Sequence, residues 1–436
     1  MKLFLMILTL LITGLSLPNG SSIASGFESP IWAPPGLSEL IEEGLSQNRE
    51  LQSIELKAAG LRAEVSVAGA LNDPVVGIGL LNVPTDSFSF SQEPMTQKQL
   101  FIAQKIPWFG KLDLKSQEAA LMADRQEALL TARRLSLARQ IADTYYQLGI
   151  IEINLDINHR LMEMVKQLIQ VSETRYSSGK GLQQDVLQAQ VELSNLLDEK
   201  LTLDKNRRTI EDRMNELLNR ETFSPVAPPE KPDEPELTLN VISLQKMALK
   251  QNPWLKAKQA EVDQALVAVK LAEKDYWPDM DFKIAYGQRS ENAAGQDLPD
   301  FLSASAAMNI PLWQKTRQNK KLSASRSRRE AASKEYRNLA IRLPHQVDAL
   351  AGEIESLTKN YYFFKDALTM QAEQWARSSM SAYEVGKVEF NTMITARIRL
   401  LRIELKTATY LYRIYQKRAE LEEIIGRPLP EAAQSS

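Results

Sequence analysis

The sequence predicts a mixed, mainly α fold in which long antiparallel coiled-coil helices are combined with four β-strands per chain. Three observations predict it. The 436-residue chain repeats itself with a period near 205 residues. Each repeat contains a very long stretch with helical periodicity and almost no Gly or Pro, and each also contains two segments in which polar and apolar residues alternate as they do in strands.

The duplication appears as matches in a constant order. Leu45–Asn48 matches Leu249–Asn252 at a shift of 204 residues, and Ile106-Pro107 falls on Ile310-Pro311 at the same shift. Further along the chain the shift becomes 207 residues, and the pattern Tyr-x-x-Gly-Lys then recurs. A shared order at an almost constant shift indicates two copies of one structural unit.

Each repeat is predicted to contain a helix, a β-hairpin, a very long helix, a sharp turn and a long returning helix. A linker with five prolines in twelve residues separates the repeats, because such a segment forms neither helix nor central strand. The predicted ranges are 25–223 for the first repeat (hairpin about 74–106, helix pair about 111–220), 224–236 for the linker, 237–428 for the second repeat (hairpin about 279–310, helix pair about 315–427) and 429–436 for a flexible tail.

The first segment is predicted to be a secretory signal over residues 1–24. Lys2 precedes an apolar run from Leu3 to Leu15, and small residues around Ala24 fit a cleavage site. A membrane anchor is the alternative. No later stretch reaches 18 apolar residues, so no transmembrane helix is expected after this segment.

The composition argues against several classes of function. The chain has 53 Lys+Arg against 55 Asp+Glu, so nothing electrostatic favours a nucleic acid partner. It has no cysteine and two histidines, His159 and His345, so we expect no metal site, no cofactor and no catalytic residues. A secreted enzyme is the alternative, but neither a phosphate-binding glycine loop nor a zinc motif is present.

The opening helices are expected over about 37–72 and 241–276, each ending near a matched proline. The strands that follow are about 9–10 residues long, which is the length that a tilted membrane strand needs. In the second repeat, alternation is clear over Asp279–Tyr286 and again up to Ile310, and the first repeat shows it less cleanly, with Gly77 and Gly79 opposite the apolar face.

The long helix of the first repeat is expected from Lys111 to about Arg175, where Gly149 is the only glycine. Roughly 60 helical residues extend ~90 Å, far more than a globular core requires. The returning helices show apolar residues spaced three and four apart, which indicates a coiled-coil seam. Pro344 is expected to bend or break the second long helix.

A two-stranded hairpin is not stable in lipid by itself, because its edge N–H and C=O groups lack partners there. Four short strands do not close a barrel with a sensible interior, whereas three chains supply twelve strands and leave room for a lumen. The simplest assembly is therefore a β-barrel continued by a tube of helices, with a wet inner wall. Its function would be conduction.

The chain resembles the outer-membrane efflux proteins of the TolC family over about residues 35–428. The resemblance rests on the duplicated plan and on four motifs: Ile106–Lys111 (IPWFGK), Tyr176–Lys180, Tyr383–Lys387 and Gln184–Ala189. Gln92–Gln97 is similar to members that serve heavy-metal efflux pumps. The alternatives are a duct for drugs or organic compounds, type I secretion, and a periplasmic coiled-coil adaptor.

The resemblance implies a homotrimer with a trimeric α-barrel and a 12-stranded transmembrane β-barrel in the outer membrane of a Gram-negative bacterium. It implies two protein partners: a periplasmic membrane-fusion adaptor and an inner-membrane efflux pump, often of the proton-driven RND type. The barrel would contact outer-membrane lipid. Substrates would leave passively from the pump to the exterior, with heavy-metal cations as one candidate cargo.

The resemblance also implies two sets of functional residues. The adaptor would dock at the helix-hairpin tips, and a periplasmic gate would be lined by residues that follow the turn glycines. Members of the family carry acidic residues in the second repeat where this chain has threonines, so Asp185 is the only acidic candidate for the gate. The tip residues are Tyr176, Gly179, Lys180, Tyr383, Gly386 and Lys387, and the gate residues are Asp185, Gln188, Thr392 and Thr395.

Overall fold

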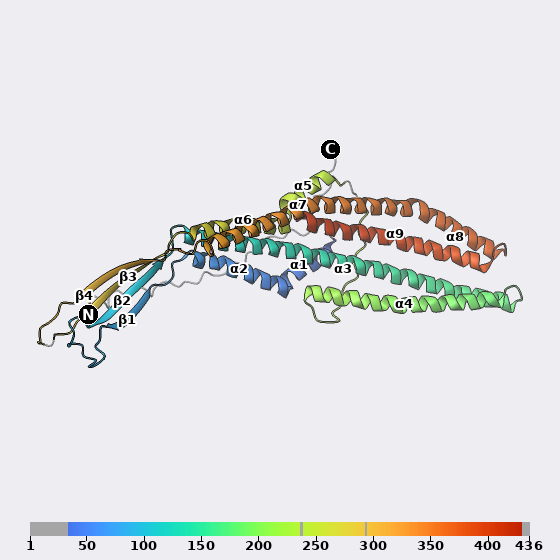
Figure 1. Ribbon diagram of the computed structural model, residues 1–436. Helices are drawn as coiled ribbons and strands as arrows, with labels where there is room; N and C mark the ends of the chain where they lie inside the picture. Colours follow the sequence, from blue (N-terminus) through green and yellow to red (C-terminus); the bar gives the residue numbers. More distant parts are fainter. Residues whose placement is uncertain (1–33, 236–238, 293, 430–436) are drawn as a thin grey trace.

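The computed structural model describes residues 34–235, 239–292 and 294–429 and shows an elongated molecule (Figure 1). The β-strands lie at one end, two helical hairpins end at the other, and long helices join them. The mainly helical fold class with four strands is confirmed. The predicted signal segment and the tail from residue 430 lie outside the described residues.

Each repeat begins with two helices. The single helices expected over 37–72 and 241–276 are wrong, because the matched residues Asn48 and Asn252 each divide them. Each Asn side chain accepts a hydrogen bond from the backbone N–H three residues further on, at 3.0 and 2.9 Å, and so caps a new helix. The helices are α1 (Pro35–Gln47), α2 (Arg49–Gly69), α5 (Val241–Gln251) and α6 (Pro253–Lys274).

The four strands form one antiparallel sheet in the order β1-β2-β3-β4, so the β2–β3 pair joins the two repeats. An apolar row crosses all four strands in register, from Ile78 through Leu100 and Tyr286 to Leu302. Ile78 is 86% exposed and Leu302 is 78% exposed, so nothing in the described part of the chain covers this face. The strands are β1 (Val75–Leu81), β2 (Gln97–Ile106), β3 (Met280–Gln288) and β4 (Phe301–Met308).

Packing on the opposite face of the sheet explains why a glycine, Gly77, stands in the first strand. The Phe101 ring lies over Gly77, where an added Cβ would be 2.4 Å from a ring carbon. The Lys283 ammonium group lies 4.0 Å from the centroid of the same ring. Gly77 therefore makes room for an aromatic–cation pair on this face.

The long helices run from the sheet to the tips. α3 alone has 67 residues, or ~100 Å. The second long helix starts at Gln318 and continues unbroken through Pro344, whose neighbours Leu343 and Val347 are buried and hold it in the core. Its departure from α geometry comes later, in a π-helical segment. These elements are α3 (Lys111–Ser177), α4 (Gln183–Leu218), α7 (Gln318–Tyr362), η1 (Phe363–Leu368), α8 (Thr369–Glu384) and α9 (Phe390–Ile425).

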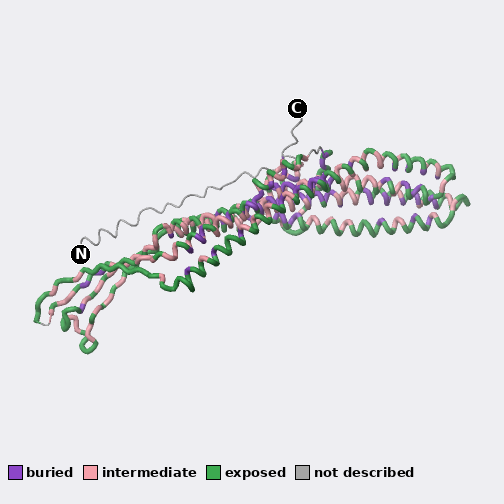
Figure 2. Tube along the Cα trace, turned by 45° about the horizontal axis from the view of Figure 1, so that its top comes forward, coloured by how far each residue is buried: buried purple, intermediate pink, exposed green. Residues whose placement is uncertain are grey.

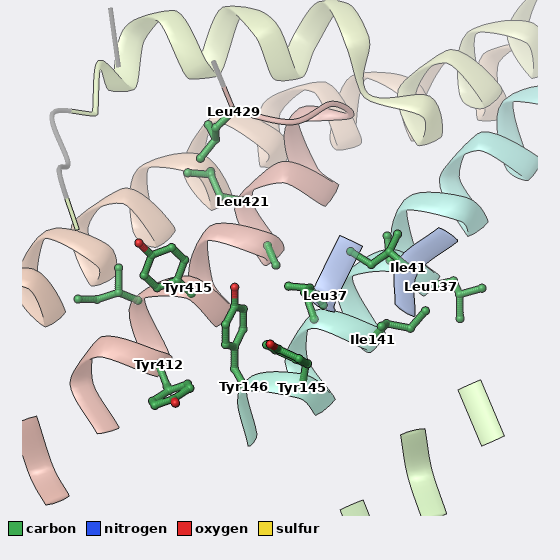
Figure 3. Packing of buried hydrophobic residues seen from close by; sticks show 14 of the residues in the cluster. Leu37, Ile41, Leu137, Ile141, Tyr145, Tyr146, Tyr412, Tyr415, Leu421 and Leu429 are labelled. Carbon is green, nitrogen blue, oxygen red and sulfur yellow. The ribbon is translucent and has the colours of Figure 1, made fainter. Parts of the chain in front are cut away.

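The main core lies halfway along the molecule, where buried residues concentrate in Figure 2. Tyr145 and Tyr146 of α3 pack there with Tyr412 and Tyr415 of α9 (Figure 3). Burial raises the pKa of Tyr412 to about 12, so its hydroxyl stays neutral. Gly149 lies against Tyr412, where a Cβ would be 2.3 Å from a ring carbon. This contact brings α3 and α9 close together.

The linker between the repeats is fastened to this core. The hydroxyls of Tyr145, Tyr362 and Tyr415 hydrogen-bond to backbone groups of residues 230–235 at 2.8–3.2 Å. Leu429, predicted as the first residue of a loose tail, is buried, and its N–H donates to a Glu422 carboxylate oxygen at 2.8 Å. The chain is therefore ordered at this position.

Candidate functional site

The two turns at the helix-hairpin tips have the same geometry. Gly179 and Gly386 both have φ of +73°, the left-handed region that glycine tolerates best. Each glycine N–H donates to the carbonyl of the tyrosine three residues earlier, Tyr176 or Tyr383, at 3.0 Å. The N–H of the lysine that follows donates to the carbonyl of the residue before that tyrosine at 2.8 Å. This is a Schellman helix end. The Tyr-x-x-Gly-Lys pattern therefore encodes a turn.

Gly386→Ala is expected to loosen the second tip. A Cβ at φ +73° costs about 1–2 kcal/mol, and hydrogen exchange of amides around 380–392 should become roughly tenfold faster. Gly352→Ala is the control, because Gly352 lies inside α7 with no atom within 4 Å of an added Cβ. It should stabilise the helix slightly. Equal exchange in both variants would contradict this account of the turn.

Two contacts hold the tips of the two hairpins together. An Arg175 guanidinium N–H donates to the Tyr383 carbonyl at 3.3 Å, and the guanidinium lies 4.7 Å from the Tyr383 ring centroid. The Gln188 amide donates to the Asn391 side-chain oxygen at 3.1 Å. Tyr383 is buried at this junction, whereas Tyr176 is half exposed. The matched tyrosines therefore differ in environment.

Sequence reasoning identified Gln188 but missed Arg175 and Asn391. At the shift of 207 residues, Arg175 corresponds to Ala382 and Asn391 to Gln184. The Arg175 position does not repeat its chemistry, so the duplication gave no signal for it. Asn391 and Gln184 are both carboxamides, and sequence reasoning did not use that match. The position of Arg175 directly before the Tyr-x-x-Gly-Lys pattern is the one sequence feature that points to it.

The predicted gate residues lie just beyond the turns. Asp185 is the third residue of α4, and Thr392 holds the matching place in α9. Asp185 is half buried, and Gln188, Thr392 and Thr395 are exposed. Within one chain the structure brings Gln188 to Asn391 but joins no two of the four predicted residues by a hydrogen bond. Lys180 and Lys387 of the tips are exposed to solvent.

A buried ion pair fixes the sheet to the helices. The Lys111 ammonium group lies 2.7 Å from an Asp279 carboxylate oxygen and 3.8 Å from one of Asp275. The Trp108 N–H also donates to Asp279 at 3.0 Å, and the Trp108 and Trp277 rings stack 4.9 Å apart. Burial raises the pKa of the Asp279 carboxyl, but the hydrogen bonds from Lys111 and Trp108 outweigh it, so the pKa lies below its ordinary value.

The chain is an open layer with two unlike edges. β1 lies at one edge of the sheet and β4 at the other. In the tip region α4 packs on α3, α3 on α9, and α9 on α8, which leaves α4 and α8 at the edges. Unlike edges close only head to tail, in a ring of copies.

An apolar row on α4 marks the surface that the next copy would cover. Leu187 is 54% exposed and Val191 is 61% exposed. At the shift of 207 residues they correspond to Ile394 and Ile398 of α9, which pack in the tip cluster with residues of α3. By the same geometry, α8 of a neighbouring copy would take the place of α3. The unlike edges and the exposed row are those expected of a subunit in a ring of copies.

The described residues show neither a metal-binding cluster nor a membrane-spanning helix. Within residues 34–235, 239–292 and 294–429, no three His, Asp or Glu side chains gather as a metal ion would require. No described helix has a stretch long and apolar enough to span a bilayer.

Comparison with known proteins gives the family. Residues 40–220 and 244–427 match the model of the family described as outer membrane efflux protein, so the chain belongs to that family. Channels of this family lie in the outer membrane of Gram-negative bacteria, with a large periplasmic helical part, and are trimeric. They work with adaptor proteins and inner-membrane pumps. No curated protein sequence is significantly similar to the chain.

Several solved channels share the fold. The chain is similar to the outer-membrane channel OprN (18% identity, 92% of this chain and 93% of that chain, TM-score 0.76). It is also similar to VceC from Vibrio cholerae (18% identity, 90% of this chain and 97% of that chain, TM-score 0.74). CusC is similar as well (15% identity, 95% of this chain and 98% of that chain, TM-score 0.76). OprN and CusC match with the same TM-score, so the likeness in fold singles out no subgroup.

Proposed function

We propose that this protein is the exit duct of a tripartite efflux assembly. Three copies would form a bore that runs from the sheet to the hairpin tips. An adaptor would dock at the two Schellman turns, and an inner-membrane pump would load the cargo. The observation that carries this proposal is the single open layer with unlike edges, whose exposed row on α4 repeats a row that is packed in α9.

The tip is the part of the duct that would open and close. The contacts of Arg175 with Tyr383, and of Gln188 with Asn391, tie one hairpin to the other near the turns. Asp185 lies six residues beyond Gly179, in the first turn of α4, so three copies would place three carboxylates around one aperture. Such a ring attracts cations.

Conductance in planar bilayers tests the proposal. The purified protein should form ion-conducting pores, and Asp185→Asn should lower the preference for cations over chloride at least twofold. Glu173→Gln is the control, because it removes one exposed acidic charge from α3 at a similar distance from the tip. Unchanged selectivity in Asp185→Asn removes Asp185 from the aperture. Absence of any pore from the folded protein overturns the duct itself.

A further inference from the structure

A cationic groove lies between α8 and α9, some way from the tip. It encloses a hollow of about 420 Å³. Three basic side chains of α9 line it together with aromatic and apolar side chains of η1 and α8. The basic residues are Arg399, Arg402 and Lys406, and the principal aromatic residues are Phe364 and Trp375.

No acidic side chain among the described residues forms an ion pair with the cations of this groove. The side chains of Arg399 and Arg402 form neither an ion pair nor a hydrogen bond with any residue in the described part of the chain. The Lys406 ammonium group lies over two aromatic rings. It is 4.9 Å from the centroid of the Phe364 ring and 5.8 Å from the centroid of the Tyr410 ring. Three like charges around one hollow repel each other, and a bound anion relieves that repulsion.

The groove is specific to the second repeat. At the shift of 207 residues, Arg399 and Lys406 correspond to Glu192 and Glu199, so the charge is reversed in the first repeat. α3 also runs without interruption where the second repeat has the π-helical segment η1. Such segments occur often at functional sites.

The basic face of α9 should remain open when copies assemble. Thr392, Thr395, Arg399, Arg402 and Lys406 are spaced three and four residues apart and therefore share one exposed face of α9. The apolar row on α4 of a neighbouring copy corresponds to a row that packs on α3, so it would meet α8 rather than this face.

We propose that this groove binds organic anions that carry an aromatic ring. Arginine guanidinium groups hold carboxylates and sulfonates through paired hydrogen bonds, and an aromatic ring packs on Trp375 and Phe364. The face that holds the groove also holds the predicted gate residues Thr392 and Thr395. Its use as a station for cargo in the bore rests on the proposed function, whereas binding itself does not.

Trp375 fluorescence in the assembled protein tests the proposal. In an uncharged maltoside detergent, 2-naphthalenesulfonate should quench a signal that Trp375→Phe removes. The double variant Arg399→Gln/Arg402→Gln should bind the sulfonate at least tenfold more weakly. The matched control Arg328→Gln/Arg337→Gln removes two exposed arginines from α7 and should bind as the native protein does. Circular dichroism establishes that each variant is folded.

Three results would overturn the proposal. One is quenching by uncharged 2-naphthalenemethanol as strong as that by the sulfonate, because charge would then not be recognised. Another is unchanged binding in the folded double variant. The third is the absence of any Trp375 signal on titration. Sulfonate binding by a protein that forms no pores would instead defeat the proposed function and leave the groove's affinity for organic anions standing.

Discussion

Gly149→Val is expected to destabilise the protein by about 3 kcal/mol or more, at the upper end of the range for overpacked cores. A Cβ at this position would lie 2.3 Å from the Tyr412 ring, and valine adds two further methyl groups. Tyr412 is 2% exposed and packs near Tyr146, so its ring has no free space to enter. The helical signal of the purified protein should be lost at a clearly lower temperature or denaturant concentration.

Gly60→Val provides the control for this prediction. Gly60 lies inside α2, where an added Cβ meets no atom within 4 Å. Valine is a slightly better helix residue than glycine, so this variant should be as stable as the native protein. If the two valine variants unfold alike, the close approach of α3 and α9 at Gly149 is not what sets the stability of this core.

Lys111→Met is expected to cost about 2–3 kcal/mol. Methionine fills a similar volume but leaves the Asp279 carboxylate without its cation. Removing one partner of a buried ion pair typically costs about 3–5 kcal/mol, and the Asp279 side chain is 21% exposed, which reduces the penalty. Thermal unfolding at pH 7 should show the loss, and Lys115→Met, which removes an exposed lysine from the same helix, should not.

The Lys111–Asp279 ion pair also predicts how the stability of the protein changes with pH. Because the pKa of folded Asp279 is lowered, its contribution to stability is complete above the ordinary carboxyl pKa and is lost as the pH falls through the folded value. The stability difference between native protein and Lys111→Met should therefore be largest near neutral pH and shrink below about pH 4. A difference that stays constant down to pH 2 would show that Lys111 acts through packing rather than charge.

The repeated parts of the fold could be predicted from the sequence, because the duplication displays them twice. The strand pairs, the long helices and the tip turns all follow from periodicity and from the Tyr-x-x-Gly-Lys pattern. The divisions at Asn48 and Asn252 were missed although these residues match. An asparagine inside a helical pattern signals a cap only when the backbone leaves the helix, and periodicity does not report that.

The parts that differ between the repeats could not be predicted. Lys111 and Lys315 match in sequence, yet Lys111 is paired with Asp279 and the corresponding position in the first repeat is Val75. The charge reversal between Glu192 and Arg399 is visible in the sequence. Its role could not be predicted, because only the packing of the helices shows that Arg399 lies on an exposed face. The Lys111–Asp279 contact joins residues 168 positions apart, and a single sequence carries no signal for it.

The central claim is that copies of the chain join through β1 and β4 around one bore, and cysteine cross-linking tests it most directly. The β2–β3 register pairs Gln104 with Phe282. The shift of 204 residues carries this pair onto Met308 of one copy and Ile78 of the next. The native chain has no cysteine, so a variant with Ile78→Cys and Met308→Cys contains only the designed pair.

Oxidation of the assembled Ile78→Cys/Met308→Cys protein should yield covalent species of up to three chains on a denaturing gel. Either single variant should yield none through this contact, and Gly79→Cys/Met308→Cys should cross-link poorly because residue 79 faces the other side of the strand. Oxidised protein that remains a single chain, or a cross-link favoured by Gly79, would contradict the closed ring.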